Sequence, residues 1–407
     1  MKGRRFPGRA PLAALILAMA ALPPAGAAAE RGRPDPGRRV LDRGESASRA
    51  WRRATPQEAG LDPKKIAAGI QDLRKERGAA CLVVVHDGLL IAEASFHGAD
   101  CARARNVKSI SKSLLSALVG IAIGDSLISG LDQNLGELLP KRMAKVADKR
   151  KREITLRELL TMTSGLASTS FGAYGDWVAS SDWVRYVLHR RLLAKPGSEY
   201  AYSTGNAHLV SAILTRATGM STLRYGRGKL FVPLGLRVLR WRRDPEGIYL
   251  GGNDMWVSAR DLARFGQLYL QDGAWEGKQL VPREWVREST SLHSRGWPER
   301  FGGYGYLWWV PEGRDGEAFF AEGSGSQYVY VSRPARMVIV LTCDLSAKGE
   351  AFDRQVQGIF QHDFEGAVPS ATSRPGLVEP LSPRGSPPRG VAAPPAHRTV
   401  ARKPLYG

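Results

Sequence analysis

The stretch SISKSLLSALVGIAI, residues 109–123, decides how the rest of this 407-residue chain is interpreted. Apolar side chains recur on nearly every side of this segment, which predicts a helix that is buried all round. Ser109 and Lys112 lie three positions apart at its start, so they share one face and are one helical turn from each other. The helix therefore brings a hydroxyl and an amine together at the edge of a buried core.

Burial gives this pair a chemical use. Desolvation disfavours the charged form of an amine, so the pKa of Lys112 should fall and its neutral form can accept the proton of Ser109. Ser109 also lies at the positive end of the helix dipole, which favours negative charge developing on its oxygen. The alternative is chance, because serines are common and one accidental S-x-x-K in such a chain is unsurprising. No second S-x-x-K occurs in the sequence.

A second segment, PGSEYAYSTGN at residues 196–206, places Tyr202 between a turn and a predicted apolar helix. A phenol at such a junction can point into a cleft and, beside a lysine, can share or relay a proton. Taken alone, Tyr202 is better explained as a half-buried aromatic residue whose hydroxyl is merely hydrogen-bonded. Its value as a candidate depends on the segments around it.

A third segment, AEGSGSQ at residues 321–327, opens a predicted strand. Its small residues would let a substrate lie along the strand edge. A backbone N–H at that edge, together with the N–H of Ser109, would form an oxyanion hole. An ordinary glycine-rich loop explains the segment equally well when it is considered alone.

The order and spacing of these segments resemble the serine β-lactamase-like family, which includes class C β-lactamases, DD-peptidases, family VIII esterases and 6-aminohexanoate-dimer hydrolases. That family shows S-x-x-K, then Y-x-N, then K-T-G or H-x-G. LLTMTSGL, beginning at Leu159, is similar to its LLxHTSGL segment, and the approach to Tyr202 resembles its PGxxFxYS pattern. The resemblance covers roughly residues 55–365. It implies Ser109 as nucleophile, with Lys112 and Tyr202 as the activating pair.

Two departures from the family pattern bear on the substrate. The Y-x-N position reads YST at residues 202–204, so the asparagine is missing unless Asn206 substitutes for it. The K-T-G position reads AEG at residues 321–323, in a register that could shift to Ser324. The family's basic residue there helps bind the carboxylate of β-lactams and peptide C-termini, and neither Ala nor Glu supplies that charge. The esterases and aminohexanoate-oligomer amidases therefore fit better.

Those looser members imply further binding residues. Their GxGGQ-like stretch resembles GSGSQ, which makes Gly323, Ser324 and Gln327 candidates for the oxyanion or substrate site. In the amidases a second tyrosine on a mobile loop contacts the amide. Tyr174 is the candidate counterpart here, although a plain surface aromatic residue is the favoured explanation of it. Asn206 completes the set of candidate binding residues.

Hydrophobic periodicity predicts strands at both ends of the folded part and helices between them. Such an order indicates an α/β (α+β) fold, in which an antiparallel sheet from N- and C-terminal segments is flanked by helices and carries a helical insertion domain. The resemblance implies the same β-lactamase/transpeptidase-like fold. The expected helices cover residues 63–77, 109–123, 156–162, 207–218, 259–270, 282–289 and 351–360. The expected strands cover 81–86 and 89–96 as a hairpin, then 304–310, 327–332 and 337–343.

The two ends of the chain differ in composition from the middle. Residues 1–29 combine a basic start, a short apolar run and a small-residue cleavage region, which is typical of a secretory signal peptide. A membrane anchor is the alternative. Residues 30–54 are expected to form a flexible lead-in, 55–365 the β-lactamase-like serine hydrolase domain, and 366–407 a disordered Pro/Arg-rich basic tail. We therefore expect an exported protein, periplasmic or secreted.

The formal net charge of +20 is concentrated at the two ends. Residues 1–54 hold twelve Lys or Arg against four Asp or Glu, and residues 366–407 hold six against one. No nucleic-acid-binding motif accompanies this charge. It indicates a loose contact of the tail with envelope polymers or anionic lipid, with no nucleic acid as partner. The family resemblance implies a small-molecule ester or amide as the substrate.

Other chemistries lack their signatures. The seven His residues are scattered without zinc-site spacing, and no nucleotide-type glycine loop occurs, so neither a metal nor a cofactor is expected. No serine has glycine two positions before and after it, which removes the α/β-hydrolase elbow. Cys81 and Cys343 lie in apolar strand-like runs and Cys101 in a polar turn. The odd count leaves one disulfide open but argues against a disulfide framework.

The sequence therefore predicts a serine hydrolase that cleaves an ester or amide through an acyl-enzyme on Ser109. A DD-peptidase or β-lactamase acting on wall peptides or β-lactams would keep the same site. A non-catalytic, penicillin-recognition-like envelope binding protein would keep only the fold. The joint presence of Ser109, Lys112 and Tyr202 favours an enzyme over the binding protein.

Overall fold

The computed structural model describes residues 50–344 and 350–369. The predicted signal peptide, most of the predicted lead-in and nearly all of the predicted tail lie outside the described residues. The compact unit of the structure ends at Val368. Within the described ranges, no helix has the length and apolar character needed to cross a membrane.

An eight-stranded antiparallel sheet forms the frame of the fold, in the order β2-β1-β13-β12-β11-β10-β9-β8. Strands from opposite ends of the folded part pair at its centre, where Val83 of β1 lies opposite Val340 of β13. The predicted sheet of N- and C-terminal segments is therefore confirmed. Its strands are β1 (Ala79–His86), β2 (Leu89–Ser95), β8 (Ser294–Trp297), β9 (Gly302–Tyr304), β10 (Trp309–Val310), β11 (Ala318–Gly323), β12 (Gln327–Ser332) and β13 (Met337–Cys343).

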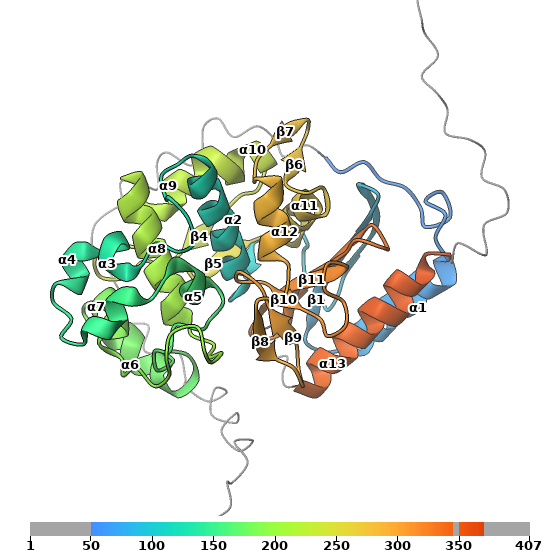
Figure 1. Cartoon of the computed structure of the whole chain (residues 1–407). Coiled ribbons are helices and arrows are strands. Elements are labelled where there is room, and N and C mark those ends of the chain that lie inside the picture. The colour runs from blue at the N-terminus through green and yellow to red at the C-terminus, as the bar shows by residue number, and fades with distance from the viewer. Residues whose placement is uncertain (1–49, 345–349, 370–407) are drawn as a thin grey trace, which may run out of the picture. The chain divides into compact units, whose positions relative to one another are not determined.

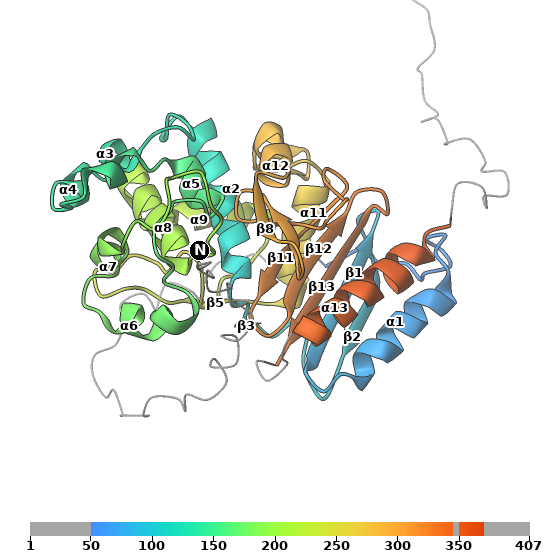
Figure 2. The ribbon, with the colours of Figure 1, turned by 60° about the horizontal axis from the view of Figure 1, so that its bottom comes forward.

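Helices cover both faces of this sheet. Strand β12 explains how, because successive side chains of a strand point to opposite faces. Tyr328 and Tyr330 point to the face where Phe360 lies, at the end of α13. Val329 points to the other face, toward Gly266 of α11. Figures 1 and 2 show α1 (Pro63–Lys75) and α13 (Glu350–Ile359) together on the first face, and α2 (Ile110–Gly124), α11 (Ala259–Leu270) and α12 (Arg283–Ser289) on the second.

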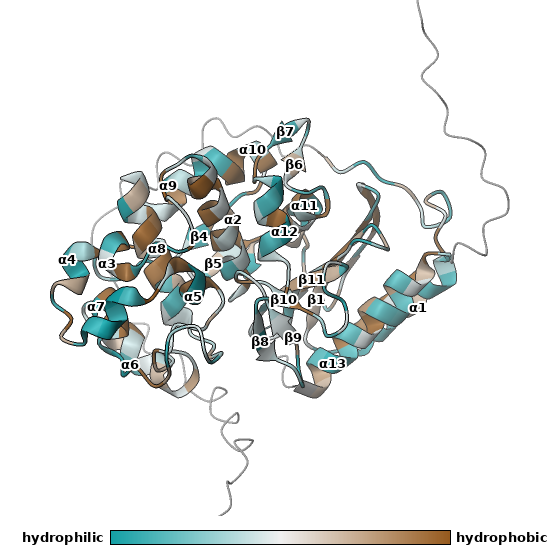
Figure 3. Ribbon diagram, viewed as in Figure 1, coloured by the Kyte–Doolittle hydropathy of each residue, from teal (hydrophilic) through white to brown (hydrophobic). Residues whose placement is uncertain are grey.

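In the sequence, the helical part comes between the two segments that form the sheet, and in space it lies beside the sheet (Figure 1). A small sheet of three strands, β3-β5-β4, joins it to the frame. Figure 3 shows that α8 is largely hydrophobic, as expected for a helix buried within this part, whereas α1 is hydrophilic along much of its length. The remaining elements are β3 (Arg105–Asn106), α3 (Leu135–Leu138), α4 (Pro140–Met143), α5 (Leu156–Leu160), α6 (Tyr174–Ala179), α7 (Trp183–His189), α8 (Thr204–Thr218), α9 (Thr222–Gly226), α10 (Val232–Leu234), β4 (Arg240–Trp241), β5 (Met255–Val257), β6 (Ala274–Trp275) and β7 (Lys278–Gln279).

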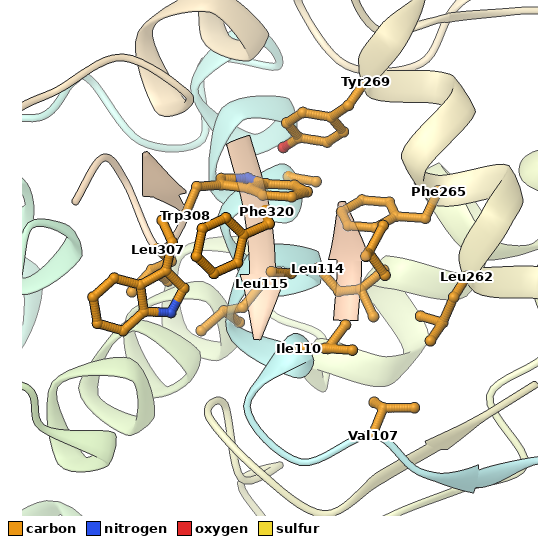
Figure 4. Close-up of a cluster of buried hydrophobic side chains, with 14 of the residues drawn as sticks. Val107, Ile110, Leu114, Leu115, Leu262, Phe265, Tyr269, Leu307, Trp308 and Phe320 are labelled. Atoms are coloured by element: carbon orange, nitrogen blue, oxygen red, sulfur yellow. The ribbon is translucent and has the colours of Figure 1, made fainter. Parts of the chain in front are cut away.

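Helix α2 is the centre of the core, as its sequence predicted. Every residue from Ile110 to Ala122 is buried, and the helix starts with Ser109 as its N-cap. Each fully buried Leu or Ile stabilises the fold by about 1.5–3 kcal/mol. Figure 4 shows Ile110, Leu114 and Leu115 of α2 surrounded by side chains of α11, of β11 and of the turn between β9 and β10, among them Leu262, Phe265, Tyr269, Phe320 and Trp308.

Local signals in the sequence fix several helix starts. Asp62 accepts a hydrogen bond from the N–H of Lys64, and Pro63 follows at the first helical position of α1. Thr155 and Glu158 form a capping box at the start of α5. These signals account for helix starts that the periodicity predicted to within one residue.

Three parts of the sheet differ from the sequence-based expectation, and one of them is the edge strand β8, which was not predicted. The strand predicted over residues 304–310 is two strands, β9 and β10, because Gly305 and Leu307 turn the chain between them. The Gly305 N–H donates to the Trp308 carbonyl at 2.8 Å, and Leu307 has a φ of 63°. Strand β11 was not predicted as a separate element. Its residues are buried on both faces, so its sequence lacks the apolar–polar alternation that marks a half-exposed strand.

The start of the fold is tied to the edge of the sheet. The N–H of Leu90 donates to the carbonyl of Arg52 at 2.8 Å, so residues before the predicted domain start at residue 55 already contact the sheet. Cys81 of β1 forms a disulfide with Cys101, and their Cα atoms are 5.4 Å apart. Cys343 is a buried free thiol. The disulfide that the sequence left open therefore joins the two cysteines nearest to each other in the chain, Cys81 and Cys101.

Candidate active site

Ser109 stands at the N-terminus of α2, where this helix contacts β11. The preceding turn is held by two hydrogen bonds. The Val107 N–H donates to the Met255 carbonyl at 2.9 Å, and the Lys108 N–H donates to Asn106 Oδ1 at 3.0 Å. Lys108 takes a positive φ of 51°, which turns the chain sharply into the helix. The result is a partly exposed Ser109 side chain at the edge of the buried core.

Lys112 lies one helical turn later and is only 1% exposed. Its Nζ donates to Ser109 Oγ at 2.9 Å, to the Gly252 carbonyl at 2.7 Å and, more weakly, to Thr204 Oγ1 at 3.4 Å. Burial lowers the pKa of Lys112 to about 7, and the nearby Glu322 carboxyl partly opposes this shift. The amine is therefore in contact with the serine and can be neutral near pH 7.

Gly252 makes this arrangement of the lysine feasible. A Cβ atom added at Gly252 would lie 3.0 Å from both Cε and Nζ of Lys112 and 2.9 Å from Cγ2 of Thr204. A side chain there would therefore push the lysine away from Ser109. Only glycine leaves both the space for the lysine chain and the carbonyl oxygen that anchors its amine.

Tyr202 is the third member of the cluster. Its ring centroid is 4.8 Å from Lys112 Nζ, and its ring stacks on that of Trp309 at 5.9 Å. Burial raises the pKa of Tyr202 above its usual range, and a hydrogen bond with Ser109 opposes this shift in part. The phenol therefore keeps its proton at neutral pH. Ser109, Lys112 and Tyr202, predicted separately from two segments, meet at one place.

Gly323 ends β11 directly against the approach to the serine. A Cβ atom added to Gly323 would lie 2.3 Å from the Val107 carbonyl oxygen and 3.1 Å from the Ser109 nitrogen. This contact fixes the register of the third motif, with Gly323 at its glycine position. Ser324 follows in the exposed turn between β11 and β12. The backbone N–H of Ser324 and that of Ser109 therefore lie on the two segments that Gly323 brings together.

The structure directs the Asn206 side-chain oxygen toward Ser164. Its side chain is fully buried in α8, and its Oδ1 accepts a hydrogen bond from Ser164 Oγ at 3.2 Å. Thr204 takes the position predicted for Asn206, because its hydroxyl is the one that contacts Lys112. Ser170 supports it, with its Oγ 3.0 Å from Thr204 Oγ1. The expectation that Asn206 substitutes for the missing asparagine is corrected accordingly.

Gln327 is also corrected as a substrate-binding residue. Its side chain is fully buried, and both N–H groups of its amide donate to backbone carbonyls, of Gly325 at 2.8 Å and of Cys343 at 3.0 Å. Its Oε1 accepts from the Cys343 N–H at 3.0 Å. The amide thus joins β12 to β13 and has no N–H left for a substrate.

Tyr174, at the start of α6, is linked to the cluster by a hydrogen bond with Asn253. Its hydroxyl accepts a hydrogen bond from Asn253 Nδ2 at 2.9 Å, and Asn253 directly follows the Gly252 that anchors Lys112. Burial raises the pKa of Tyr174 to about 12. The residue is thus a partly buried, hydrogen-bonded tyrosine next to the site, rather than a plain surface aromatic.

Glu322 is the residue at the site that sequence reasoning passed over. It directly precedes Gly323, and its carboxyl interacts electrostatically with both Lys112 and Tyr202. Burial and the nearby Asp353 carboxylate raise the pKa of Glu322 to about 8. The sequence signal was present, as the unusual acidic residue of the AEG segment, but it was taken only as the absence of a positive charge.

A buried ion pair lies next to Glu322. Arg300 donates to Asp353 Oδ2 from Nη2 at 2.5 Å and from Nε at 3.1 Å. Asp353 also accepts from Ser326 Oγ at 2.6 Å and from Tyr328 Oη at 3.0 Å. The guanidinium is therefore already committed to Asp353. In the described part of the chain, no group of three or more His, Cys, Asp or Glu side chains is arranged to hold a metal ion.

Comparison with known proteins places this geometry in a family. The sequence model described as "Beta-lactamase" matches residues 64–362. A curated, uncharacterized protein of Alkalihalophilus pseudofirmus is 27% identical over 215 residues, which is 51% of this chain and 60% of that protein. The match with this relative therefore spans less than two thirds of its length.

Solved structures show the same fold at low sequence identity. A protein of Bacillus anthracis, titled as a candidate 6-aminohexanoate-dimer hydrolase, is 21% identical with a TM-score of 0.62, over 72% of this chain and 81% of its own. EstCE1, titled a hydrolase with promiscuous acyltransferase activity, is 17% identical with a TM-score of 0.60, over 73% and 98%. An octameric penicillin-binding protein homologue from Pyrococcus abyssi is 17% identical with a TM-score of 0.58, over 74% and 77%.

These structural likenesses establish the β-lactamase/transpeptidase-like fold that the sequence predicted. The match to the family model goes further, because it covers well over half of the chain and includes all three segments of the site. The chain therefore belongs to the β-lactamase family of serine hydrolases.

Proposed function

We propose that this protein hydrolyses an ester or amide through a covalent acyl-enzyme on Ser109. The observation that carries the proposal is the contact of 2.9 Å between Ser109 Oγ and the amine of Lys112, whose pKa is lowered by burial to about 7. A neutral amine at hydrogen-bond distance is what a serine needs to become a nucleophile. The partial exposure of Ser109 leaves its oxygen accessible to a substrate.

In the proposed acylation step, Ser109 Oγ attacks the substrate carbonyl carbon while Lys112 Nζ takes the hydroxyl proton. The carbonyl oxygen becomes negatively charged and accepts hydrogen bonds from the N–H groups of Ser109 and Ser324. Gly323 supports this assignment, because its close contact with Val107 and Ser109 holds the two N–H groups on adjacent segments.

Tyr202 and Lys112 divide the proton transfers in this scheme. The phenol stays protonated because its pKa is raised, so it donates a proton to the departing alcohol or amine and is reprotonated by Lys112. In the second half of the reaction, water gives its proton to the same pair and attacks the acyl carbon. The Ser109–carbon bond then breaks, and Ser109 recovers its proton.

Charge at the site favours esters and simple amides over substrates that carry a carboxylate. Ala321 supplies no cation in the third motif, and the nearby Arg300 is bound to Asp353. A β-lactam or a wall-peptide C-terminus would bring a carboxylate without a free partner to this place. Tyr174, held by Asn253, is proposed to line the acyl or leaving-group side.

Export of the protein is part of the proposal. The Cys81–Cys101 disulfide supports it, because disulfides persist mainly outside the cytoplasm. The predicted signal peptide over residues 1–29 points the same way. The basic tail over residues 366–407 is proposed to hold the protein loosely near anionic envelope surfaces.

The proposal is tested by labelling and turnover together. Wild-type protein should react with a fluorescent alkyl phosphonate and hydrolyse p-nitrophenyl butyrate, and Ser109→Ala should lose both. Ser198→Ala, which removes an exposed hydroxyl bound to the Lys195 carbonyl, is the control and should retain both. Full labelling of Ser109→Ala would place the nucleophile elsewhere. Parallel assays with nitrocefin and a fluorescent penicillin distinguish the alternative: stable acylation at Ser109 without ester turnover would favour a penicillin-binding activity.

A further inference from the structure

Glu322 points to the same side of the sheet as the catalytic phenol. Side chains two apart on a strand share a face, so Glu322 lies on the side of Phe320. The Phe320 ring lies 6.4 Å from that of Trp309, which in turn stacks on Tyr202. Electrostatic interactions join the Glu322 carboxyl to Lys112, to Tyr202 and to the neighbouring Tyr304.

This carboxyl is accessible although the strand around it is not. Of the six residues of β11, the other five are buried and Glu322 alone is partly exposed. Within residues 50–344 and 350–369, no hydrogen bond or ion pair engages its oxygens. A carboxyl that is part of a buried strand, reachable from outside and without a partner is arranged to receive one from a ligand.

Arg300 and Lys112 both act electrostatically on Glu322 and lower its pKa, but within the described residues neither is hydrogen-bonded to it. Arg300 is bound to Asp353 by two hydrogen bonds, of 2.5 and 3.1 Å. Lys112 is only partly charged near pH 7, because burial lowers its pKa to about 7. Glu322 is therefore held partly as the neutral acid, and a cation arriving beside it would ionise it and complete an ion pair.

Aromatic side chains lie beside Tyr202, the phenol with which Glu322 interacts electrostatically. Phe171 is 47% exposed, and its ring lies 6.3 Å from that of Tyr202 and 6.1 Å from that of Trp297. Faces of such rings attract ammonium groups. They offer nothing to an anion, so the aromatic surroundings and the carboxyl select the same kind of ligand.

We propose that the acyl part of the substrate carries a protonated amine and that Glu322 binds it. This inference rests on the proposed hydrolase function and narrows its substrate to aminoacyl esters and amides. Gly323, next in the chain, approaches the Ser109 nitrogen closely. Since a strand rises about 3.3 Å per residue, the ammonium belongs within a few bonds of the scissile carbonyl.

The test compares two p-nitrophenyl esters that differ only in an ammonium and a methyl group, the β-alanyl and the butyryl ester. Wild-type protein should show a kcat/KM ratio of about 10–100 in favour of the β-alanyl ester, as expected for a charge-assisted hydrogen bond. Glu322→Gln should bring the ratio close to one. Because both esters depend on the same Lys112, any change in that amine cancels in the ratio.

Glu312→Gln is the matched control, since it removes the same charge from an exposed loop between β10 and β11 and should leave the ratio unchanged. Phosphonate labelling of Ser109 in Glu322→Gln shows that the variant is folded. An equal ratio in wild type and Glu322→Gln, with labelling intact, would overturn this inference and leave the hydrolase function standing. Loss of labelling and of all ester turnover in the wild type would remove the hydrolase function, and this inference with it.

Discussion

Lys112 illustrates how one residue can depend on three separate segments of the chain. Its amine contacts Ser109 of its own helix, Thr204 at the start of α8 and the Gly252 carbonyl near β5. Each contact satisfies one donor of an amine that is otherwise shut off from water. The lowered pKa of Lys112 follows from this burial, and Glu322 opposes it.

The pH dependence of activity should report this amine. Below a pKa of about 7 the ammonium form of Lys112 predominates and cannot accept the Ser109 proton, so kcat/KM should fall about tenfold per pH unit. Above that pKa the amine is neutral and the rate should level off. The measurement is kcat/KM for p-nitrophenyl butyrate between about pH 5 and pH 9.

A matched variant gives the sign of the electrostatic coupling. Glu322 raises the pKa of Lys112, so in Glu322→Gln the rise of kcat/KM with pH should occur at a lower pH than in the wild type. A limb near pH 10, where an exposed lysine titrates, would contradict the assignment of Lys112 as the base.

Removing the phenol should separate proton transfer from packing. Tyr202→Phe keeps the ring that stacks on Trp309 but loses the hydroxyl, and kcat should fall by about 10²–10⁴. Tyr200→Phe is the control, because the Tyr200 hydroxyl is buried without a hydrogen-bond partner in the described structure. It should keep full activity. Equal losses in both variants would mean that Tyr202 acts only through packing.

Residue identities at the site were only partly predictable. Ser109, Lys112 and Tyr202 were found because their segments carry a recognisable order. The roles of Thr204 and Asn206 were exchanged, because the sequence does not reveal that α8 begins at Thr204 and directs Asn206 toward Ser164. Gln327 was assigned to the substrate because its use as a link between β12 and β13 depends on contacts across the sheet.

At the scale of elements, the end of β11 and the start of α2 touch through Gly323. Gly323→Ala would bring a methyl group to 2.3 Å from the Val107 carbonyl oxygen, so one of the two backbones must move. The N–H groups proposed to hold the oxyanion would then separate. We expect kcat/KM to fall by about 10²–10³, the usual effect of losing one such donor, with the protein still folded.

The control for this prediction is another glycine replacement. Gly228→Ala meets no atom within 4 Å and should leave activity and melting temperature nearly unchanged. Full activity of Gly323→Ala would show that the contact between β11 and α2 has no part in catalysis. A change in KM alone would place it in substrate binding instead.

Elements themselves were predictable where a signal is local. The hairpin turn at Asp87 and Gly88 takes the positive φ angles, 50° and 75°, that this pair of residues favours. Helix α11 and strands β12 and β13 have the bounds that periodicity predicted. The split between β9 and β10 was missed because it depends on the turn at Leu307, a residue that gives no turn signal.

At the scale of the molecule, the Cys81–Cys101 disulfide closes a loop around β2. Closing a loop with a sequence separation of 20 residues stabilises a fold by about 3 kcal/mol. Reduction, or replacement of both cysteines by serine, should lower the free energy of unfolding by that amount and leave ester hydrolysis at 25 °C intact. Thermal unfolding with and without reductant measures the effect. No change in melting temperature would mean that the bridge does not form in solution.

The pairing of β1 with β13 has a consequence for how the protein is made. The centre of the sheet joins residues near Val83 to residues near Val340, so it cannot form until almost the whole folded part has left the ribosome. Translation proceeds at about 5–20 residues per second, which leaves the nascent chain open for many seconds. For the export proposed above, this delay would leave the translocation machinery an unfolded polypeptide to thread instead of a finished globule. The strand order that assembles the sheet would then also favour passage of the chain through a narrow membrane pore.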